Sequence, residues 1–229
     1  AVKYHTRKFV MISTDKAVNP TSVMGCSKRI CEIYCQSLNQ AIVEGKVKGI
    51  TQFVTTRFGN VLGSNGSVIP LFRKQIKKGG PVKVTHPDII RFFMLIPEAC
   101  RLVLEAGTMG NGGEIYVFDM GEPVRIADLA RRMIQLSGAT NVEIKYTGLR
   151  EGEKLYEEVL NDKEDSIPTI HPKIMVAKVR EYDYAVACAN EERLLEASNT
   201  FDDMAIVQVM KEIVPEYKSM ASKYNVLDK

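Results

Sequence analysis

An acidic and a basic residue stand side by side directly after a short apolar run. Residues 9–13 (Phe-Val-Met-Ile-Ser) show no polar alternation, which predicts a strand of a parallel sheet that is covered on both faces. Thr14, Asp15 and Lys16 follow at its carboxyl end, where ligand and catalytic groups gather in open α/β sheets. A carboxylate beside an ammonium can form an acid/base pair. On its own, however, this tripeptide is more often an exposed turn.

A second candidate, Lys28, lies on the helix expected to follow this strand. Residues 19–22 (Asn-Pro-Thr-Ser) predict a turn and a helix N-cap, and the helix should extend over residues 22–43. Lys28 is spaced to share one helical face with Met24 and Glu32. That face can point toward the sheet edge, although an isolated lysine of this kind would be a surface residue.

The rest of the chain alternates strands and helices. A strand at 50–58 completes a strand–helix–strand unit, which indicates an α/β fold with a parallel sheet. The pattern further predicts a loop at 59–66, helices at 68–78, 96–107 and 126–137, strands at 82–85, 114–119 and 142–146, a helical segment at 153–165 and a helical tail at 190–224.

Composition excludes several classes of function. The net charge is +3 and no Lys/Arg run alternates with aromatic residues, so we expect no nucleic-acid partner. The five cysteines form no C-x-x-C and the three histidines are scattered, so we expect neither a disulfide framework nor a metal site. No apolar stretch is long enough for a membrane span. We therefore expect a cytoplasmic chain that makes no membrane contact itself.

One feature of dinucleotide-binding folds is missing from the sequence. Nothing shows the order strand, G-x-G-x-x-G, helix, and the spacing of Gly59, Gly63 and Gly66 does not match it. If the chain is part of a dinucleotide enzyme, we expect its pyrophosphate-binding turn to lie upstream of Ala1.

Five segments in one order resemble the extended short-chain dehydrogenases/reductases that act on nucleotide sugars. More closely, they resemble the large UDP-N-acetylglucosamine 4,6-dehydratases of bacterial capsule and O-antigen polysaccharide synthesis. The segments are FVMISTDKAVNPTSVMGCSKR, TTRFGNVLGSNGSVIPLFRKQIKKGGPVKVT, IIRFFMLIPEA, EIYVFDMGEPVRIADLA and GLREGEKLYEE. This resemblance identifies the chain as a C-terminal fragment of such an enzyme, which would be inactive alone.

The resemblance implies a fold and its division into two domains. We expect a truncated Rossmann-type parallel sheet with an interleaved, smaller α/β substrate-binding domain. Residues 1–65 and 89–120 should form the second half of the Rossmann domain. Residues 66–88 and 121–229 should form the substrate-binding domain and a C-terminal helical tail.

Met24 departs from the pattern of most of the superfamily. There a Y-x-x-x-K motif supplies a tyrosine base, whereas this sequence has Met24 four residues before Lys28. A thioether has no proton to exchange. In the large 4,6-dehydratases methionine is the usual residue, so the departure favours that group. It leaves open which residue deprotonates the sugar 4-hydroxyl.

The resemblance also implies the reaction and its catalytic residues. Hydride leaves C4 of the sugar for NAD(P)+, water is eliminated across C5 and C6, and hydride returns to C6. Lys16 would take the C5 proton and Asp15 would protonate the departing 6-hydroxyl. Thr14 would hydrogen-bond the 4-hydroxyl, and Lys28 would bind the nicotinamide ribose. The product would be a UDP-4-keto-6-deoxy sugar.

The same resemblance implies binding residues for cofactor and substrate, all named by their positions in this sequence. Arg91 and Arg150 would bind the diphosphate, because guanidinium groups match phosphate oxygens. For any one arginine, a surface salt bridge is about equally expected. The other expected cofactor contacts are Ser13, Arg57 and Gly59, and the other expected substrate contacts are Asn60, Val61, Val68, Pro70, Leu71 and Glu153.

Several alternatives remain open at the level of sequence. NAD(P)+ would be bound mainly by the upstream part, whose full-length parent would be anchored in the inner membrane. A homodimer through the helix that carries Met24 and Lys28 is expected from the resemblance alone. The rival functions are a nucleotide-sugar 4-epimerase and a non-catalytic nucleotide-sugar-binding module. Intact Asp15, Lys16 and Lys28 argue against the binding module.

Overall fold

A five-stranded sheet forms the centre of the larger part of the molecule. The computed structural model describes residues 1–158, 160 and 165–228. The strand order is β1-β2-β7-β11-β10. The strands are β1 (Lys8–Ile12), β2 (Gln52–Arg57), β7 (Ile115–Phe118), β11 (Ile174–Lys178) and β10 (Asp165–Pro168). The first three run parallel, and β11 and β10 pair antiparallel. The α/β prediction with a parallel-rich sheet is confirmed.

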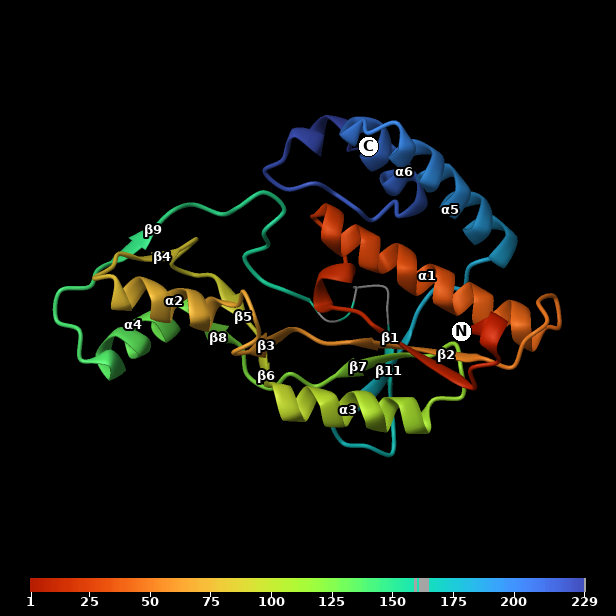
Figure 1. Ribbon diagram of the computed structural model, residues 1–229, viewed down its shortest axis with the longest axis horizontal. Helices are drawn as coiled ribbons and strands as arrows, with labels where there is room; N and C mark the ends of the chain where they lie inside the picture. The colour runs from red at the N-terminus through yellow and green to blue at the C-terminus, as the bar shows by residue number, and fades with distance from the viewer. Residues whose placement is uncertain (159, 161–164, 229) are drawn as a thin grey trace.

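Two helices cover this sheet on opposite faces (Figure 1). They are α1 (Val23–Val43) and α3 (Ile96–Met109). The Ser22 side chain accepts a hydrogen bond from the Gly25 N–H at 3.2 Å and caps α1. Pro97 in the first turn of α3 needs no backbone donor there. In β2, which lies between them, residues 53–57 are buried, and Val54 is fully buried.

A smaller lobe lies at one end of the sheet, at the left of Figure 1. It contains α2 (Val68–Lys77), α4 (Ile126–Ser137) and two pairs of short strands: β4 (Val82–Val84) with β9 (Ile144–Tyr146), and β5 (Ile90–Arg91) with β8 (Val124–Arg125). Its own apolar core includes Phe72, Val82 and Ile126. The pair β3 (Asn60–Leu62) and β6 (Phe93–Leu95) lies between this lobe and the sheet.

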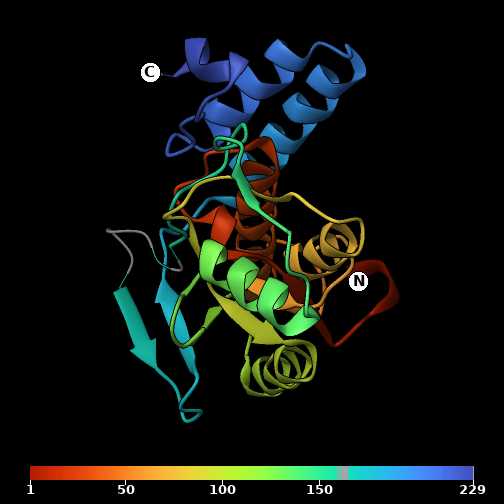
Figure 2. The same cartoon turned by 90° about the vertical axis from the view of Figure 1, so that its left-hand side faces the viewer.

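The C-terminal helices pack against α1 and not against the smaller lobe (Figure 2). They are α5 (Tyr184–Asn199) and α6 (Asp203–Ile213), and a short 3-10 helix, η3 (Lys223–Leu227), follows. Cys26 and Ile33 of α1 share a buried cluster with Val207 and Val214. Two more 3-10 helices are η1 (Val2–Tyr4) and η2 (Asp15–Ala17).

The division expected from the sequence needs correction. Residues 165–178, which we expected outside the Rossmann domain, supply two strands of the main sheet. The expected C-terminal helical tail contains α5 and α6, which pack on α1. The loop expected at 59–66 contains β3. The helix expected at 153–165 is wrong for the described residues there, which are irregular up to β10, while 159 and 161–164 lie outside them. Across the described part of the chain, no helix has the length and apolar character required to cross a membrane.

Candidate active site

Asp15 and Lys16 form an ion pair immediately after β1, in η2. Lys16 Nζ lies 2.9 Å from Asp15 Oδ1 and donates to Asn60 Oδ1 at 3.3 Å. The Thr14 hydroxyl donates to the same Asp15 Oδ1 at 2.8 Å. Asn60 comes from β3, directly after β2, so the carboxyl ends of two neighbouring parallel strands supply this cluster. The structure thus brings together Thr14, Asp15, Lys16 and Asn60.

Gly59 allows Asp15 to lie at this position. The Asp15 side chain is fully buried. A Cβ on Gly59 would lie 2.9 Å from Asp15 Oδ2 and 3.3 Å from Met120 Cε. Asp15 Oδ2 has no hydrogen-bond partner among the described residues. The lack of a side chain on Gly59 therefore lets the backbone approach the Asp15 carboxyl closely. The resemblance implied another role for Gly59, a contact with the cofactor.

Lys28 lies at the same edge, on the first turns of α1. Its ammonium donates to the Ile12 carbonyl at the end of β1, at 3.1 Å. Lys28 remains partly exposed, and Met24, one turn earlier, is 49% exposed. Both side chains are therefore accessible beside the Asp15–Lys16 pair. Lys28 can still donate to a ligand, whereas the Met24 thioether offers no proton.

Two expected cofactor contacts have structural roles. Arg57 is fully buried, and its guanidinium donates to both oxygens of Glu32, from Nε to Oε1 at 2.8 Å and from Nη2 to Oε2 at 2.7 Å. The Ser13 hydroxyl donates to Glu32 Oε1 at 2.6 Å. Both side chains turn inward toward Glu32 on α1, and their contact with a cofactor stays a prediction.

A cavity of about 230 Å³ is lined by residues of the smaller lobe, of β3 and β6, and of the segment that carries Arg150. Six of the eight expected substrate contacts line it: Asn60, Val68, Leu71, Arg91, Arg150 and Glu153. Val61 and Pro70 do not line it and sit in β3 and α2. The lining combines apolar side chains such as Val68 and Leu71 with charged ones such as Arg150 and Glu153, which suits a ligand with a flat ring and a charged portion.

The two arginines of this cavity are held differently. Arg91 is buried, and its guanidinium donates to the carbonyls of Ile90 and Lys154 at 2.7 and 2.8 Å. Arg150 is exposed at the cavity, and its backbone N–H donates to Glu153 Oε2 at 2.9 Å. Arg91 thus anchors the loop that carries Arg150, and Arg150 presents the more available guanidinium.

Glu157 was not identified from the sequence, although it lies in the segment GLREGEKLYEE. Its side chain is 4% exposed, with Oε1 3.8 Å from Lys16 Nζ and 3.6 Å from Arg91 Nε. Burial raises the pKa of the Glu157 carboxyl above its ordinary value, Asp15 adds to this effect, and the cations Lys16, Arg91 and Lys154 oppose it. A buried carboxyl beside a catalytic candidate has no sequence signal of its own, because burial depends on the folded loop.

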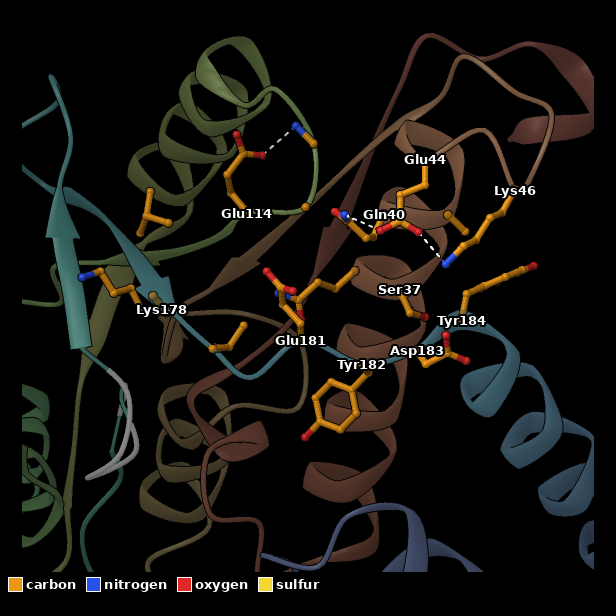
Figure 3. A pocket seen from close by; sticks show the side chains of 17 residues that line it. Ser37, Gln40, Glu44, Lys46, Glu114, Lys178, Glu181, Tyr182, Asp183 and Tyr184 are labelled. Atoms are coloured by element: carbon orange, nitrogen blue, oxygen red, sulfur yellow. Dashed lines mark hydrogen bonds and ion pairs between the residues drawn. The ribbon is translucent and has the colours of Figure 1, made fainter.

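A larger cavity, of about 540 Å³, lies at the other end of the sheet (Figure 3). It is lined by residues of α1, by Glu114 before β7 and by residues 176–184. None of the expected site residues lines it. Several of its charged groups bind within the chain: Glu44 pairs with Lys46 at 2.7 Å, and Glu114 accepts from the Gly112 N–H at 2.7 Å. We therefore assign the functional site to the cluster around Asp15.

The site can receive the nicotinamide end of a dinucleotide but shows no metal centre. The accessible Lys28 ammonium and the carboxyl edge of β1 match a ribose hydroxyl as ligand. Within residues 1–158, 160 and 165–228, no group of three His, Cys, Asp or Glu side chains could hold a metal ion. The absence of a metal site expected from the sequence thus remains a prediction.

Comparison with known proteins places this geometry in a family. The profile of the family described as "Polysaccharide biosynthesis protein" matches residues 1–179. The chain is 56% identical over 177 residues to the capsular polysaccharide biosynthesis protein CapD of Staphylococcus aureus, covering 76% of this chain and 28% of that protein. It is 39% identical over 166 residues to a UDP-glucose 4-epimerase of Rickettsia canadensis, covering 72% and 46%.

A solved structure supports the same placement. The X-ray structure of Pen from Bacillus thuringiensis superimposes with a TM-score of 0.72 at 32% identity, covering 80% of this chain and 57% of that one. The chain therefore spans less than two thirds of each of these three relatives. The profile match and the identities agree with the resemblance of the sequence segments. This chain belongs to the polysaccharide biosynthesis protein family, within the NAD-dependent epimerase/dehydratase superfamily.

Proposed function

We propose that the chain is the C-terminal part of a UDP-N-acetylglucosamine 4,6-dehydratase. The observation that carries this proposal is the buried Asp15 carboxyl paired with Lys16 at 2.9 Å beside the cavity lined by Arg150. Elimination of water across C5 and C6 needs a base for the C5 proton and an acid for the departing hydroxyl. An epimerase, which returns hydride to C4, needs no such pair.

Each residue of the site has a role in this reaction. A bound NAD(P)+ supplies hydride acceptance at C4 and its later return to C6. Lys16 takes the C5 proton, Asp15 protonates the 6-hydroxyl and Thr14 hydrogen-bonds the 4-hydroxyl. Lys28 binds the nicotinamide ribose, and its charge favours loss of the 4-hydroxyl proton.

The cavity accommodates the UDP part of the substrate. Arg150 binds the diphosphate, and Glu153 accepts from a ribose hydroxyl. Val68 and Leu71 on α2 pack against the uracil ring. The choice of N-acetylglucosamine as the hexose comes from the resemblance of the sequence segments.

The pyrophosphate-binding turn for NAD(P)+ belongs, in this proposal, to an upstream part of the enzyme. Among the described residues, β1 pairs with β2 alone, and Phe9 and Ile12 on it are 39% and 43% exposed. An exposed apolar strand edge can accept a further parallel strand. The full-length enzyme would then hold the cofactor and be anchored in the membrane with this domain in the cytoplasm, and the isolated chain would be inactive.

The test is dehydration of UDP-N-acetylglucosamine by the full-length enzyme, followed by mass spectrometry. The expected product has lost one water, and Lys16→Met or Asp15→Asn abolishes this loss while the fold and UDP binding persist. Lys46→Met, an exposed lysine at the other end of the sheet, is the matched control. Inversion at C4 without water loss would contradict the proposal and establish the epimerase, which the Rickettsia relative favours.

A further inference from the structure

The Glu157 carboxyl is poised next to the catalytic pair. Its Oε1 atom lies 3.8 Å from Lys16 Nζ, within reach of a small movement of the long and partly exposed lysine side chain. Its Oε2 atom is buried and has no hydrogen-bond partner among the described residues. An ionised carboxylate oxygen without a donor is costly to bury. The position therefore favours a carboxyl that can accept a proton.

The charges around Glu157 support the same property. Burial raises the pKa of Glu157, and Asp15 from η2 adds to this effect. Lys16 from η2, Arg91 from β5 and Lys154 from the same loop lower it, but the net shift is upward. The carboxyl consequently takes up a proton more readily than an exposed glutamate does.

A role for Glu157 in the dehydration rests on the proposed function, because it depends on where the protons of that reaction go. Oxidation of the 4-hydroxyl releases a proton that Met24 cannot accept. Thr14 donates to Asp15 Oδ1 at 2.8 Å, so its oxygen can take the 4-hydroxyl proton while its own proton passes to Asp15. Asp15 is then the acid that the departing 6-hydroxyl needs. It can no longer accept the proton of the Lys16 ammonium.

Lys16 must nevertheless be neutral before it can take the C5 proton. We propose that Glu157 is the proton acceptor for Lys16: it takes the ammonium proton so that the neutral amine can act at C5. Glu157 acts through Lys16 and need not contact the sugar. Position 24 has no tyrosine that could take the 4-hydroxyl proton. With Glu157 as a second proton-accepting carboxyl, the site holds both the 4-hydroxyl proton and the Lys16 proton and releases neither to solvent.

The proton count closes over one turnover. At rest, Asp15, Lys16 and Glu157 together hold one proton, on Lys16. The 4-hydroxyl proton moves to Asp15 and the Lys16 proton moves to Glu157. Asp15 then protonates O6, which leaves as water, while the C5–H electron pair forms the C5–C6 double bond and Lys16 takes the proton. Lys16 returns that proton to C5 and regains its own from Glu157. The hydride moved from C4 to C6 does not change this count.

The experiment is the pH profile of Glu157→Gln in the full-length enzyme. Glu158→Gln is the matched control, because Glu158 is the adjacent carboxyl and pairs with Lys154 at 2.9 Å away from Lys16. With Gln at 157, Lys16 must lose its proton to solvent before it can act, so the amount of neutral amine depends on the pH of the solution. We expect kcat to fall at pH 7 and to rise by up to about tenfold per pH unit as the pH increases to 8.5.

The wild type and Glu158→Gln should instead show a nearly flat kcat over this range, and KM for the UDP-sugar should change little in either variant. Glu157→Asp keeps a carboxyl at this position, so its kcat should be lower than that of the wild type but nearly independent of pH. If Glu157→Gln does not fold, the pH profile of Glu157→Asp tests the proposal in its place. A Glu157→Gln profile with the wild-type shape, at whatever absolute rate, would overturn the role of Glu157. C4 inversion without water loss by the wild type would instead overturn the proposed function.

Discussion

The buried carboxylate of Glu32 provides a quantitative test of how the site is held. It accepts hydrogen bonds from Arg57 Nη2 at 2.7 Å, from Arg29 Nη1 at 3.0 Å and from the Ser13 hydroxyl at 2.6 Å. Glu32 and Arg57 are both fully buried. The network thereby joins α1 to the ends of β1 and β2, the two strands that precede Asp15 and Asn60.

Glu32→Gln keeps the size of the side chain but removes its charge, so the buried Arg57 guanidinium loses the carboxylate of Glu32, while Arg29 keeps its ion pair with Glu216 at 3.2 Å. Breaking a buried ion pair by removing one partner costs about 3–5 kcal/mol. The amide oxygen can still accept one of the hydrogen bonds, so we expect a loss near 3 kcal/mol in the free energy of unfolding. For a domain of this size that corresponds to a decrease of about 6–12 °C in Tm.

The pH dependence of stability gives a second measurement of the same network. Burial alone would raise the pKa of Glu32, but the charges of Arg57 and Arg29 and the hydrogen bonds from Arg57 and Ser13 overcome it and hold the pKa below the ordinary 4.5. A lowered pKa contributes stability that is present above about pH 4.5 and lost as the pH falls further. The wild type should therefore lose more stability than Glu32→Gln between pH 5 and pH 3.

Thermal and urea unfolding of the two proteins at pH 7 and pH 4 would measure both effects. Glu44→Gln is the control, because Glu44 forms an exposed ion pair with Lys46 near the end of the same helix. Exposed pairs contribute little to stability. If Glu32→Gln were as stable as Glu44→Gln at pH 7, the argument that the buried network holds the site would be refuted.

Three further changes test other parts of the structure. Gly59→Ala places a Cβ 2.9 Å from Asp15 Oδ2, so we expect a stability loss of about 1–3 kcal/mol in urea unfolding and a lower kcat. Arg150→Ala should raise the Kd for UDP, measured by calorimetry, by about tenfold, because a charged hydrogen bond is lost. Lys211→Met removes a buried ammonium that pairs with Asp228. It should lower the free energy of unfolding by about 1–2 kcal/mol and Tm by a few degrees.

The local parts of the fold were predictable from the sequence. The helix α4 (Ile126–Ser137) agrees at both ends with the prediction, because an apolar face at helical spacing and Gly138 in the left-handed conformation delimit it locally. Strands β10 and β11 were not predicted. β11 pairs with β7, more than 50 residues earlier in the chain, and such a long-range contact leaves no local pattern. β10 joins the sheet through β11 alone among the described residues.

The site could be predicted only in part, for the same physical reason. Asp15, Lys16 and Lys28 stand at a strand end and at a helical spacing, and the resemblance of the sequence segments made them catalytic candidates; the structure brings them to one sheet edge. The same resemblance implied a cofactor contact for Arg57. The sequence does not show that its guanidinium turns inward to Glu32 on α1. The direction of a long side chain is decided by its partners in the fold.

The loop that carries Arg150 and Glu157 is positioned by segments distant in the sequence. The Thr21 hydroxyl, just before α1, donates to the Gly152 carbonyl at 2.8 Å, and the Gly152 N–H donates to the Met220 carbonyl at 2.7 Å. A Cβ on Gly152 would lie 2.6 Å from Ser22 Cβ, so only glycine permits this approach. The start of α1 and the C-terminal segment therefore hold the loop from two sides. The C-terminal helices pack on α1 through the apolar cluster that contains Cys26 and Val207, and the segment that follows them helps to position the loop whose carboxyl faces Lys16.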